Sequence, residues 1–254
     1  MNLYVSNLHQ ARTTKDRVVA VLQTVLLYAL YVAASKGLLA TMNGYLPPSW
    51  SAGGWRSGYV GHLAILLVAL ALIGVLTPFI GSRFGLGWPK GPTLLGPALG
   101  FGALFGLLML VVDYGPALWH HQAPRGPYGT ALSNMLPWLA MQGIFVGISE
   151  EIPFRSLLLV FLSSRLPGRV RVGRLDVSVA GVVIGVAFSL AHADAFWTTS
   201  FSAALGQQIY AIGMSVYCAY LFEKSGSIVA PIVFHNAGDV VEWGLCFALN
   251  GAWR

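Results

Sequence analysis

Residues 130–163 read TALSNMLPWLAMQGIFVGISEEIPFRSLLLVFLS, an apolar stretch that carries Glu150, Glu151 and Arg155 near its middle. About 20 predominantly apolar residues are enough to cross the hydrocarbon core of a membrane as a helix. A charged residue at the centre of such a helix costs roughly 2.5–3.5 kcal/mol, so it is rarely present without a use. This segment therefore predicts a membrane helix whose charged residues serve a function.

The rest of the chain has the same character. It has 254 residues, of which 56% are hydrophobic and only 9% are charged, whereas soluble domains carry about 25% charged residues. Backbone polar groups in lipid must be satisfied within each segment, which favours helices. We therefore predict an all-α, polytopic transmembrane helical bundle of about seven spans within a single membrane domain, residues 1–254. The expected spans are 18–42, 59–80, 94–112, 130–163, 177–192, 201–222 and 228–249.

The net charge of +6 comes from basic residues in the short loops between these spans. Such loops set the orientation of a membrane protein, because the cytoplasmic side carries more lysine and arginine. The lipid bilayer is therefore the expected partner of these residues, and nucleic acid is not. One side would hold ten basic residues: Arg12, Lys15, Arg17, Arg83, Lys90, Arg165, Arg169, Arg171, Arg174 and Lys224. The other side would hold only Arg56, Arg125 and Arg254, so we predict a cytoplasmic N-terminus.

Within the fourth span, the two adjacent glutamates are not equivalent. Glu151 and Arg155 are four residues apart and share one helix face, in the order that favours an ion pair. Glu150 points about 100° away from Glu151 on a regular helix. Two carboxylates and one arginine leave one negative charge without a partner. The structural alternative is an ion pair that only holds helices together.

Two histidines lie on other spans. His192 ends the fifth span, and His235 lies one turn before Asp239 on the seventh. If the three helices converge, these groups can satisfy one another around a small wet cavity. There a carboxylate could take a proton from water, one histidine could relay it, and another could donate to a developing oxyanion. The same histidines and carboxylates could equally hold a divalent metal such as zinc with an open water position.

Three ordered motifs in this sequence resemble those of the CPBP family. They are Glu-Glu-x-x-x-Arg at 150–155, Phe-x-x-x-His at 188–192 and His-x-x-x-Asp at 235–239. The family comprises CAAX proteases and bacteriocin-processing proteins, also called type II CAAX endopeptidases or glutamic intramembrane proteases. The resemblance covers roughly residues 133–242. It divides the chain into variable N-terminal spans, 1–129, and a catalytic core, 130–250.

The resemblance implies a role for each matching residue in an intramembrane endopeptidase that hydrolyses a peptide bond of a membrane-associated peptide or protein. Glu150 would activate water with the help of His192, and His235 and Asp239 would lie on the oxyanion side. Glu151 and Arg155 would support Glu150. The last position is often asparagine in the family, and an ionised aspartate cannot donate to an oxyanion, so Asp239 would be protonated or would orient His235. The resemblance also implies an integral protein of the bacterial cytoplasmic membrane.

Two other functions are compatible with these residues. Some CPBP proteins are linked to bacteriocin immunity or act as non-catalytic partners in membrane complexes. A proton-coupled transporter could use the same carboxylates and histidines as a relay. However, the sequence lacks the inverted repeat that is common in transporters.

Overall fold

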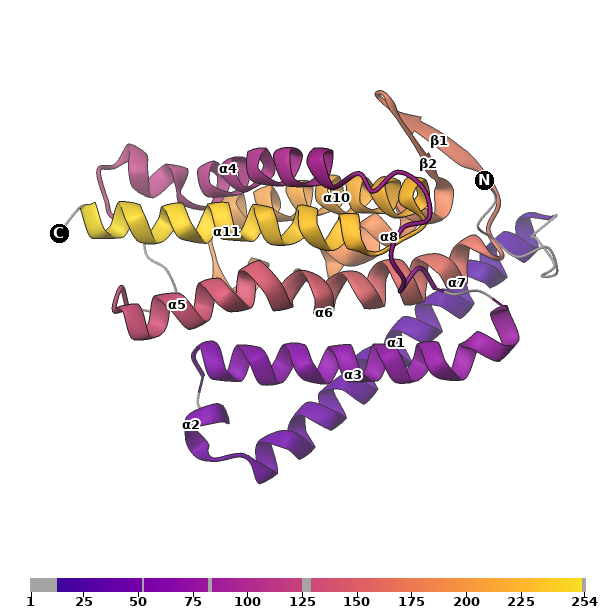
Figure 1. Ribbon diagram of the computed structural model, residues 1–254, viewed down its shortest axis with the longest axis horizontal. Coiled ribbons are helices and arrows are strands. Elements are labelled where there is room, and N and C mark those ends of the chain that lie inside the picture. The colour runs from indigo at the N-terminus through magenta and orange to yellow at the C-terminus, as the bar shows by residue number, and fades with distance from the viewer. Residues whose placement is uncertain (1–12, 52, 82–83, 125–128, 253–254) are drawn as a thin grey trace.

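The computed structural model describes residues 13–51, 53–81, 84–124 and 129–252 as a helical bundle with one small hairpin (Figure 1). The long helices are α1 (Thr14–Tyr45), α3 (Trp55–Ile80), α4 (Leu95–Trp119), α10 (Phe201–Ser225) and α11 (Val229–Ala252). The shorter helices are α2 (Pro48–Ser51), α8 (Val179–Leu190) and α9 (Ala195–Thr198). The segment 132–163 is one continuous rod of five pieces: α5 (Leu132–Ala140), η1 (Met141–Val146), α6 (Gly147–Glu151), η2 (Ile152–Leu159) and α7 (Val160–Ser163).

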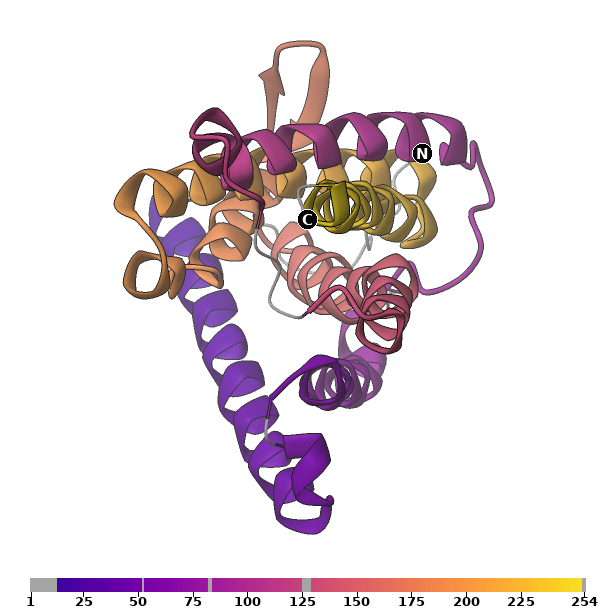
Figure 2. The ribbon, with the colours of Figure 1, turned by 90° about the vertical axis from the view of Figure 1, so that its left-hand side faces the viewer.

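The predicted helical membrane bundle is confirmed, and each expected span overlaps a helix, although the fifth, 177–192, begins in strand β2 and only four helices of the described chain meet the criteria for a span by length and composition. Among the described residues, four segments are long and apolar enough to cross a membrane: Thr14–Tyr45, Trp55–Ile80, Leu95–Trp119 and Val179–Thr198. The remaining expected spans are helical but carry polar side chains, among them Glu150, Glu151, His235 and Asp239. These are the helices at the centre of the bundle, while α1 and α3 flank them (Figure 2).

The outer helices expose the surface that a lipid environment requires. Leu26 on α1 and Phe79 on α3 leave 71% and 74% of their surfaces uncovered. Because exposed apolar side chains of this density would be unfavourable in water, they mark the part of the protein that meets acyl chains.

The rod 132–163 is wound as a π-helix over two stretches, η1 and η2, and Glu150 and Glu151 lie between them. Pro137 and Pro153 lack an N–H group, which weakens the regular α-helical pattern nearby. The side chain of Asn236 of α11 hydrogen-bonds to the backbone at the end of η1. Its Oδ1 accepts from the Gly147 N–H at 2.8 Å, and its Nδ2 donates to the Ile144 carbonyl at 3.3 Å. Short π-helical stretches are frequent at functional sites because they re-aim side chains.

Helices α4 and α11 lie side by side and run in the same direction (Figure 1). Their close approach depends on two glycines of α4, because a Cβ at Gly102 or Gly106 would collide with backbone atoms of Phe234 or Gly238. Small residues spaced by four allow membrane helices to pack backbone to backbone. This contact fixes the N-terminal half of α4 against the face of α11 that carries Phe234 and Gly238.

A β-hairpin, absent from the predicted elements, joins the rod to α8. It consists of β1 (Arg169–Val172) and β2 (Leu175–Ser178), paired antiparallel. Its alternating basic and apolar residues suit a half-exposed strand, and Gly173 supplies the positive φ of +60° in the turn. Four of the basic residues used to predict the orientation, Arg12, Arg83, Arg125 and Arg254, lie outside the described residues.

Candidate active site

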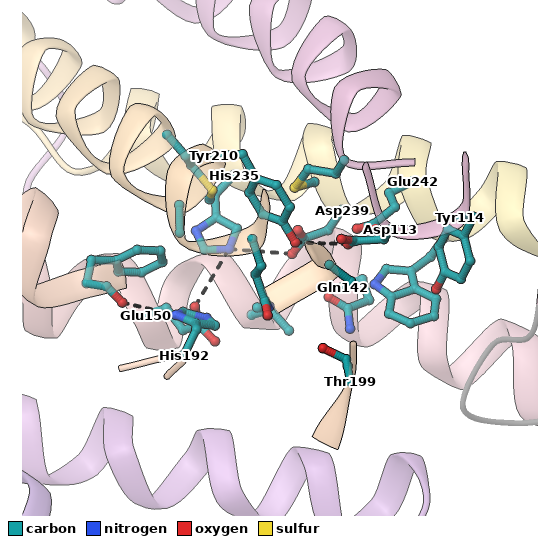
Figure 3. Close-up of a pocket in the computed structure, with 18 of the residues that line it drawn as sticks. Asp113, Tyr114, Gln142, Glu150, His192, Thr199, Tyr210, His235, Asp239 and Glu242 are labelled. Carbon is teal, nitrogen blue, oxygen red and sulfur yellow. Dashed lines mark hydrogen bonds and ion pairs between the residues drawn. The ribbon is translucent and has the colours of Figure 1, made fainter. Parts of the chain in front are cut away.

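The three helices that carry the predicted site residues converge on one cavity of about 660 Å³. Glu150 comes from α6, His192 from the turn after α8, and His235 and Asp239 from α11; all four line the cavity (Figure 3). Glu151 and Arg155 do not line it and lie behind its wall. The expected convergence is therefore present in the structure, with the two adjacent glutamates in different environments.

Glu151 is the buried, paired glutamate. Its side chain and that of Arg155 are both 0% exposed, and Arg155 Nε lies 2.9 Å from Glu151 Oε2. The other carboxylate oxygen accepts from His235 Nδ1 at 2.8 Å. The ion pair expected from the spacing is thus present, and it reaches across to α11 through the imidazole.

Glu150 is the glutamate that faces the cavity, with 19% of its side chain exposed. Two imidazole nitrogens flank its carboxylate: His235 Nε2 at 3.8 Å and His62 Nδ1 at 3.9 Å. Within the described chain, no lysine or arginine forms an ion pair with it. The carboxylate is therefore free to accept a proton from a water molecule in the cavity.

A hydrogen bond of His192 determines which of its two ring nitrogens carries the hydrogen. Its Nδ1 lies 3.0 Å from the Phe188 carbonyl oxygen, and a carbonyl only accepts, so Nδ1 carries the hydrogen. In the neutral ring Nε2 is then an acceptor. Gln208 holds the turn in place by donating from Nε2 to the His192 carbonyl at 3.1 Å.

Phe188, the aromatic residue of the Phe-x-x-x-His motif, packs against both histidines of the site. Its ring centroid lies 4.9 Å from that of His192 and 6.1 Å from that of His235. The Arg155 guanidinium carbon lies 5.3 Å from the same centroid. One aromatic ring therefore separates the arginine from the cavity while it packs against both histidines.

Asp239 lies next to the ring of His235, with Oδ2 3.5 Å from His235 Nε2. Because His235 Nδ1 faces a carboxylate, it is the donor nitrogen, and Nε2 can donate as well only when the ring is an imidazolium. Glu150, Glu151 and Asp239 together surround the ring with negative charge, an electrostatic setting that stabilises the cation. Of the two roles open to Asp239, this geometry matches the orientation of His235.

Sequence reasoning missed His62 of α3. Its Nδ1 lies 2.8 Å from Ser149 Oγ, and the Ser149 hydroxyl already donates to the Val146 carbonyl at 2.9 Å. Ser149 must then accept the Nδ1 hydrogen of His62, and this bond holds the ring beside Glu150, whose Oε1 lies 3.9 Å from Nδ1. An ionisable residue inside an expected span was the signal that could have identified it.

The opposite end of the cavity holds a second polar group that the motifs did not indicate as a cluster. Tyr210 of α10 donates to Asp113 Oδ2 of α4 at 2.9 Å. Glu242 of α11, two turns beyond His235, hydrogen-bonds to the same aspartate. Because an ionised carboxylate only accepts, one of the two carries a proton and the pair holds a single negative charge. Asp113 directly follows the expected third span, so its position in the sequence resembled that of an ordinary loop residue.

The residues present do not form a zinc site of the kind considered above. Within the described parts of the chain, no group of three His, Cys, Asp or Glu side chains is arranged to hold a metal ion. The Nδ1 atoms of His192 and His235 are directed to Phe188 and Glu151, so only the Nε2 atom of each ring faces the cavity. A structural or catalytic zinc needs three or four convergent ligands.

Fold and site together define a helical membrane protein with a glutamate–histidine cavity inside its bundle. Residues 132–241 match the family described as Rce1-like: Type II CAAX prenyl endopeptidase Rce1-like. This part of the chain is therefore Rce1-like, as the three motifs predicted, and every predicted site residue falls within it. No curated protein and no solved structure gives a significant match. The family supports a CAAX-type intramembrane endopeptidase as the general class.

Proposed function

We propose that the chain is an intramembrane endopeptidase that hydrolyses a peptide bond of a membrane-associated peptide or protein, with Glu150 as the residue that activates water. The observation that carries the proposal is the contrast between Glu150 and Glu151. Glu151 is neutralised by Arg155 at 2.9 Å, whereas Glu150 faces a cavity that also exposes His192 and His235. A carboxylate that is not paired with an arginine or lysine, in a cavity large enough for water, is suited to accept a proton.

The chemistry assigned to the site is as follows. Glu150, assisted by His192 Nε2, takes a proton from water while the water oxygen forms a bond to the carbonyl carbon. The oxygen of that carbonyl becomes negative and is stabilised by the His235 Nε2–H, which Glu151 and Asp239 orient. The C–N bond then breaks as the leaving amine takes the proton from Glu150. His62 is a positioning residue for the Glu150 carboxylate.

The expected setting is the bacterial cytoplasmic membrane with the N-terminus in the cytoplasm, and the catalytic core is assigned to residues 130–250. The basic residues of the hairpin and Lys224 gather at one end of the bundle, where Arg169 Nη1 pairs with Glu223 Oε2 at 3.0 Å. That end is the cytoplasmic one in the proposed orientation.

The test is cleavage of a membrane-tethered reporter library by purified protein in proteoliposomes. Glu150→Gln and His192→Asn should each lower cleavage by about 10²–10⁴-fold, the usual contribution of a positioned general base. Asp194→Asn is the matched control, because Asp194 is exposed and does not line the cavity. Full cleavage by both site variants, with the catalytic residue removed, would overturn the assignment. Absence of cleavage together with pH-dependent solute flux would instead identify a transporter.

A further inference from the structure

The charge of the cavity wall is unbalanced. Four carboxylate residues line it, and the described lining includes neither lysine nor arginine; the carboxylates are Asp113, Glu150, Asp239 and Glu242. Three histidines also line it, but all three, His62, His192 and His235, lie on the Glu150 side of the site described above. Carboxylates inside a membrane bundle are costly and are retained where they meet a cation or a proton. Asp113 and Glu242 have no role in the water-activating chemistry.

These two carboxylates form the far end of the cavity. They contact each other, and Tyr210 donates to Asp113 at 2.9 Å. On α11 the polar side chains His235, Asp239 and Glu242 recur every three or four residues, so they line one face. Seven residues of helix separate His235 from Glu242, which is about 10 Å along the axis.

An unsatisfied amide points to a ligand at this end. Gln142 of η1 is only 7% exposed and lines the cavity, where Figure 3 shows its carboxamide between Asp113 and Thr199. No hydrogen bond joins its carboxamide to any other described residue. Its polar atoms are open to the cavity, so they are available to form hydrogen bonds to an occupant.

Aromatic rings complete this end of the cavity. The rings of Trp138 and Trp243 meet edge to face with centroids 5.1 Å apart, and Tyr114 lies 6.4 Å from Trp243 in the same geometry. Aromatic faces next to carboxylates attract organic cations, because the ring quadrupole and the negative charge act in the same direction. An anionic or purely apolar group would gain neither interaction.

We propose that the end of the cavity formed by Asp113, Gln142, Tyr210, Glu242 and Trp243 is a subsite for a positively charged arginine or lysine side chain of the peptide substrate. The guanidinium or ammonium group pairs with the negative charge shared by Asp113 and Glu242, and its stem lies against the indole. Because a buried charge must be matched by a partner of opposite sign, the uncharged equivalent of the same residue is discriminated against. This subsite rests on the proposed endopeptidase function.

The spacing along α11 between His235, which lies beside the catalytic glutamate, and Glu242 sets the position of that residue in the substrate. An extended chain advances roughly 3.3–3.6 Å per residue, so a separation of about 10 Å along α11 corresponds to three residues or fewer. The basic residue therefore lies within about three positions of the cleaved bond. In an extended substrate, a basic residue six positions away lies roughly 20 Å from the cleaved bond and passes beyond the subsite.

The first experiment measures binding without catalysis. Purified full-length Glu150→Gln protein in detergent is titrated with Nα-acetyl-arginine methylamide and with its uncharged isostere, Nα-acetyl-citrulline methylamide. The arginine probe should bind at least tenfold more tightly. Adding Asp113→Asn and Glu242→Gln should abolish the difference, whereas adding Asp194→Asn should leave it intact. Equal affinity for both probes overturns the proposal.

The second experiment measures specificity with a membrane-tethered library in which one arginine is moved from one to six positions away from a fixed cleavage sequence. Wild-type protein should prefer arginine within three positions, and Asp113→Asn with Glu242→Gln should lose at least tenfold of that preference while still cutting neutral substrates. Cleavage by the double variant with unchanged arginine preference would contradict the subsite and still support the protease function. Selective arginine binding without any cleavage removes the protease and leaves the subsite. Circular dichroism of each variant confirms that it is folded.

Discussion

At the scale of single residues, Glu150 and Glu151 are neighbours in the chain but experience different surroundings. The first has a cavity on one side and two imidazoles within 3.9 Å. The second is fully enclosed with Arg155. A buried pair whose one member is removed leaves an uncompensated charge, which costs far more than the loss of an exposed one. The same substitution should therefore lower the stability of the protein much more at Glu151 than at Glu150.

We expect Glu151→Gln to lower the free energy of unfolding by about 3–5 kcal/mol, because it leaves the Arg155 guanidinium buried and unpaired. Glu150→Gln should change stability by less than about 1 kcal/mol, since its side chain faces the cavity. Denaturation of both variants in the same detergent, followed by circular dichroism, measures the difference. Equal losses at the two positions would contradict the distinction between a catalytic and a structural glutamate.

We expect His62→Ala to reduce kcat by about 10–100-fold with KM nearly unchanged, because the side chain orients Glu150 and does not bind substrate. His62→Asn should recover part of the loss, since its amide can still donate to Ser149. The control is His120→Ala, which removes an exposed histidine. A rise in KM alone, or no rescue by asparagine, would assign His62 to substrate binding or to simple packing.

The sequence could predict a contact only where the two residues lie within a few positions of each other in one helix. Glu151 and Arg155 could be paired from sequence because their contact is set by helical spacing. His62 and Asp113 could not, because they reach the cavity only through the packing of α3 and α4 against the Rce1-like helices. That packing depends on close contacts such as Gly106 against Gly238. A hydrophobic segment does not show which of its residues will face a neighbouring helix. The π-helical winding around the glutamates was equally invisible to a pattern based on 3.6 residues per turn.

At the scale of elements, Asn236 joins α11 to the rod that carries both glutamates. Its amide makes two hydrogen bonds to the backbone of that rod, at 2.8 and 3.3 Å. We expect Asn236→Leu to destabilise the protein by about 1–3 kcal/mol, because the Gly147 N–H loses its buried acceptor. Asn236→Asp keeps the acceptor and should retain more stability. Hydrogen exchange at residues 141–151 measures the effect. Unchanged protection in Asn236→Leu would show that these two hydrogen bonds do not stabilise the rod.

The hairpin offers a pH-dependent contact outside the membrane helices. The Arg169 guanidinium, 2.9 Å from the carboxylate, lowers the pKa of Asp176. This ion pair therefore contributes fully above the usual carboxyl pKa, near 3.9, and its contribution is lost as the pH falls through the lowered folded-state pKa.

We expect protection factors of the hairpin amides, corrected for intrinsic exchange, to fall slightly below about pH 4, because exposed pairs contribute little. In Asp176→Asn the same factors should not change over that range. Nuclear magnetic resonance or mass spectrometry of exchanged amides follows both proteins. A pH response that persists in Asp176→Asn would place its origin elsewhere in the hairpin.

At the scale of the whole molecule, the charged end and the cavity lie toward opposite ends of the bundle. The loop that carries Lys90 is bound to the turn between α10 and α11, where Ser227 Oγ donates to the Gly87 carbonyl at 2.6 Å. The hairpin and Lys224 lie at the same end. The cavity instead draws on the C-terminal half of α4, on the middle of α11 and on Thr199, which lies just before α10. If the basic end is cytoplasmic, the cavity lies nearer the outer face of the membrane.

This sidedness predicts the reactivity of introduced cysteines. Arg174→Cys, in the hairpin turn, should react with a membrane-impermeant maleimide only after the cytoplasmic side is made accessible. Thr199→Cys should react in intact cells, because it lies at the cavity end. The two native cysteines, Cys218 and Cys246, are free and buried, so they give little background. Labelling of both positions from one side would show that α8 does not cross the membrane. Reversed labelling would place the basic end outside and the cavity toward the cytoplasm.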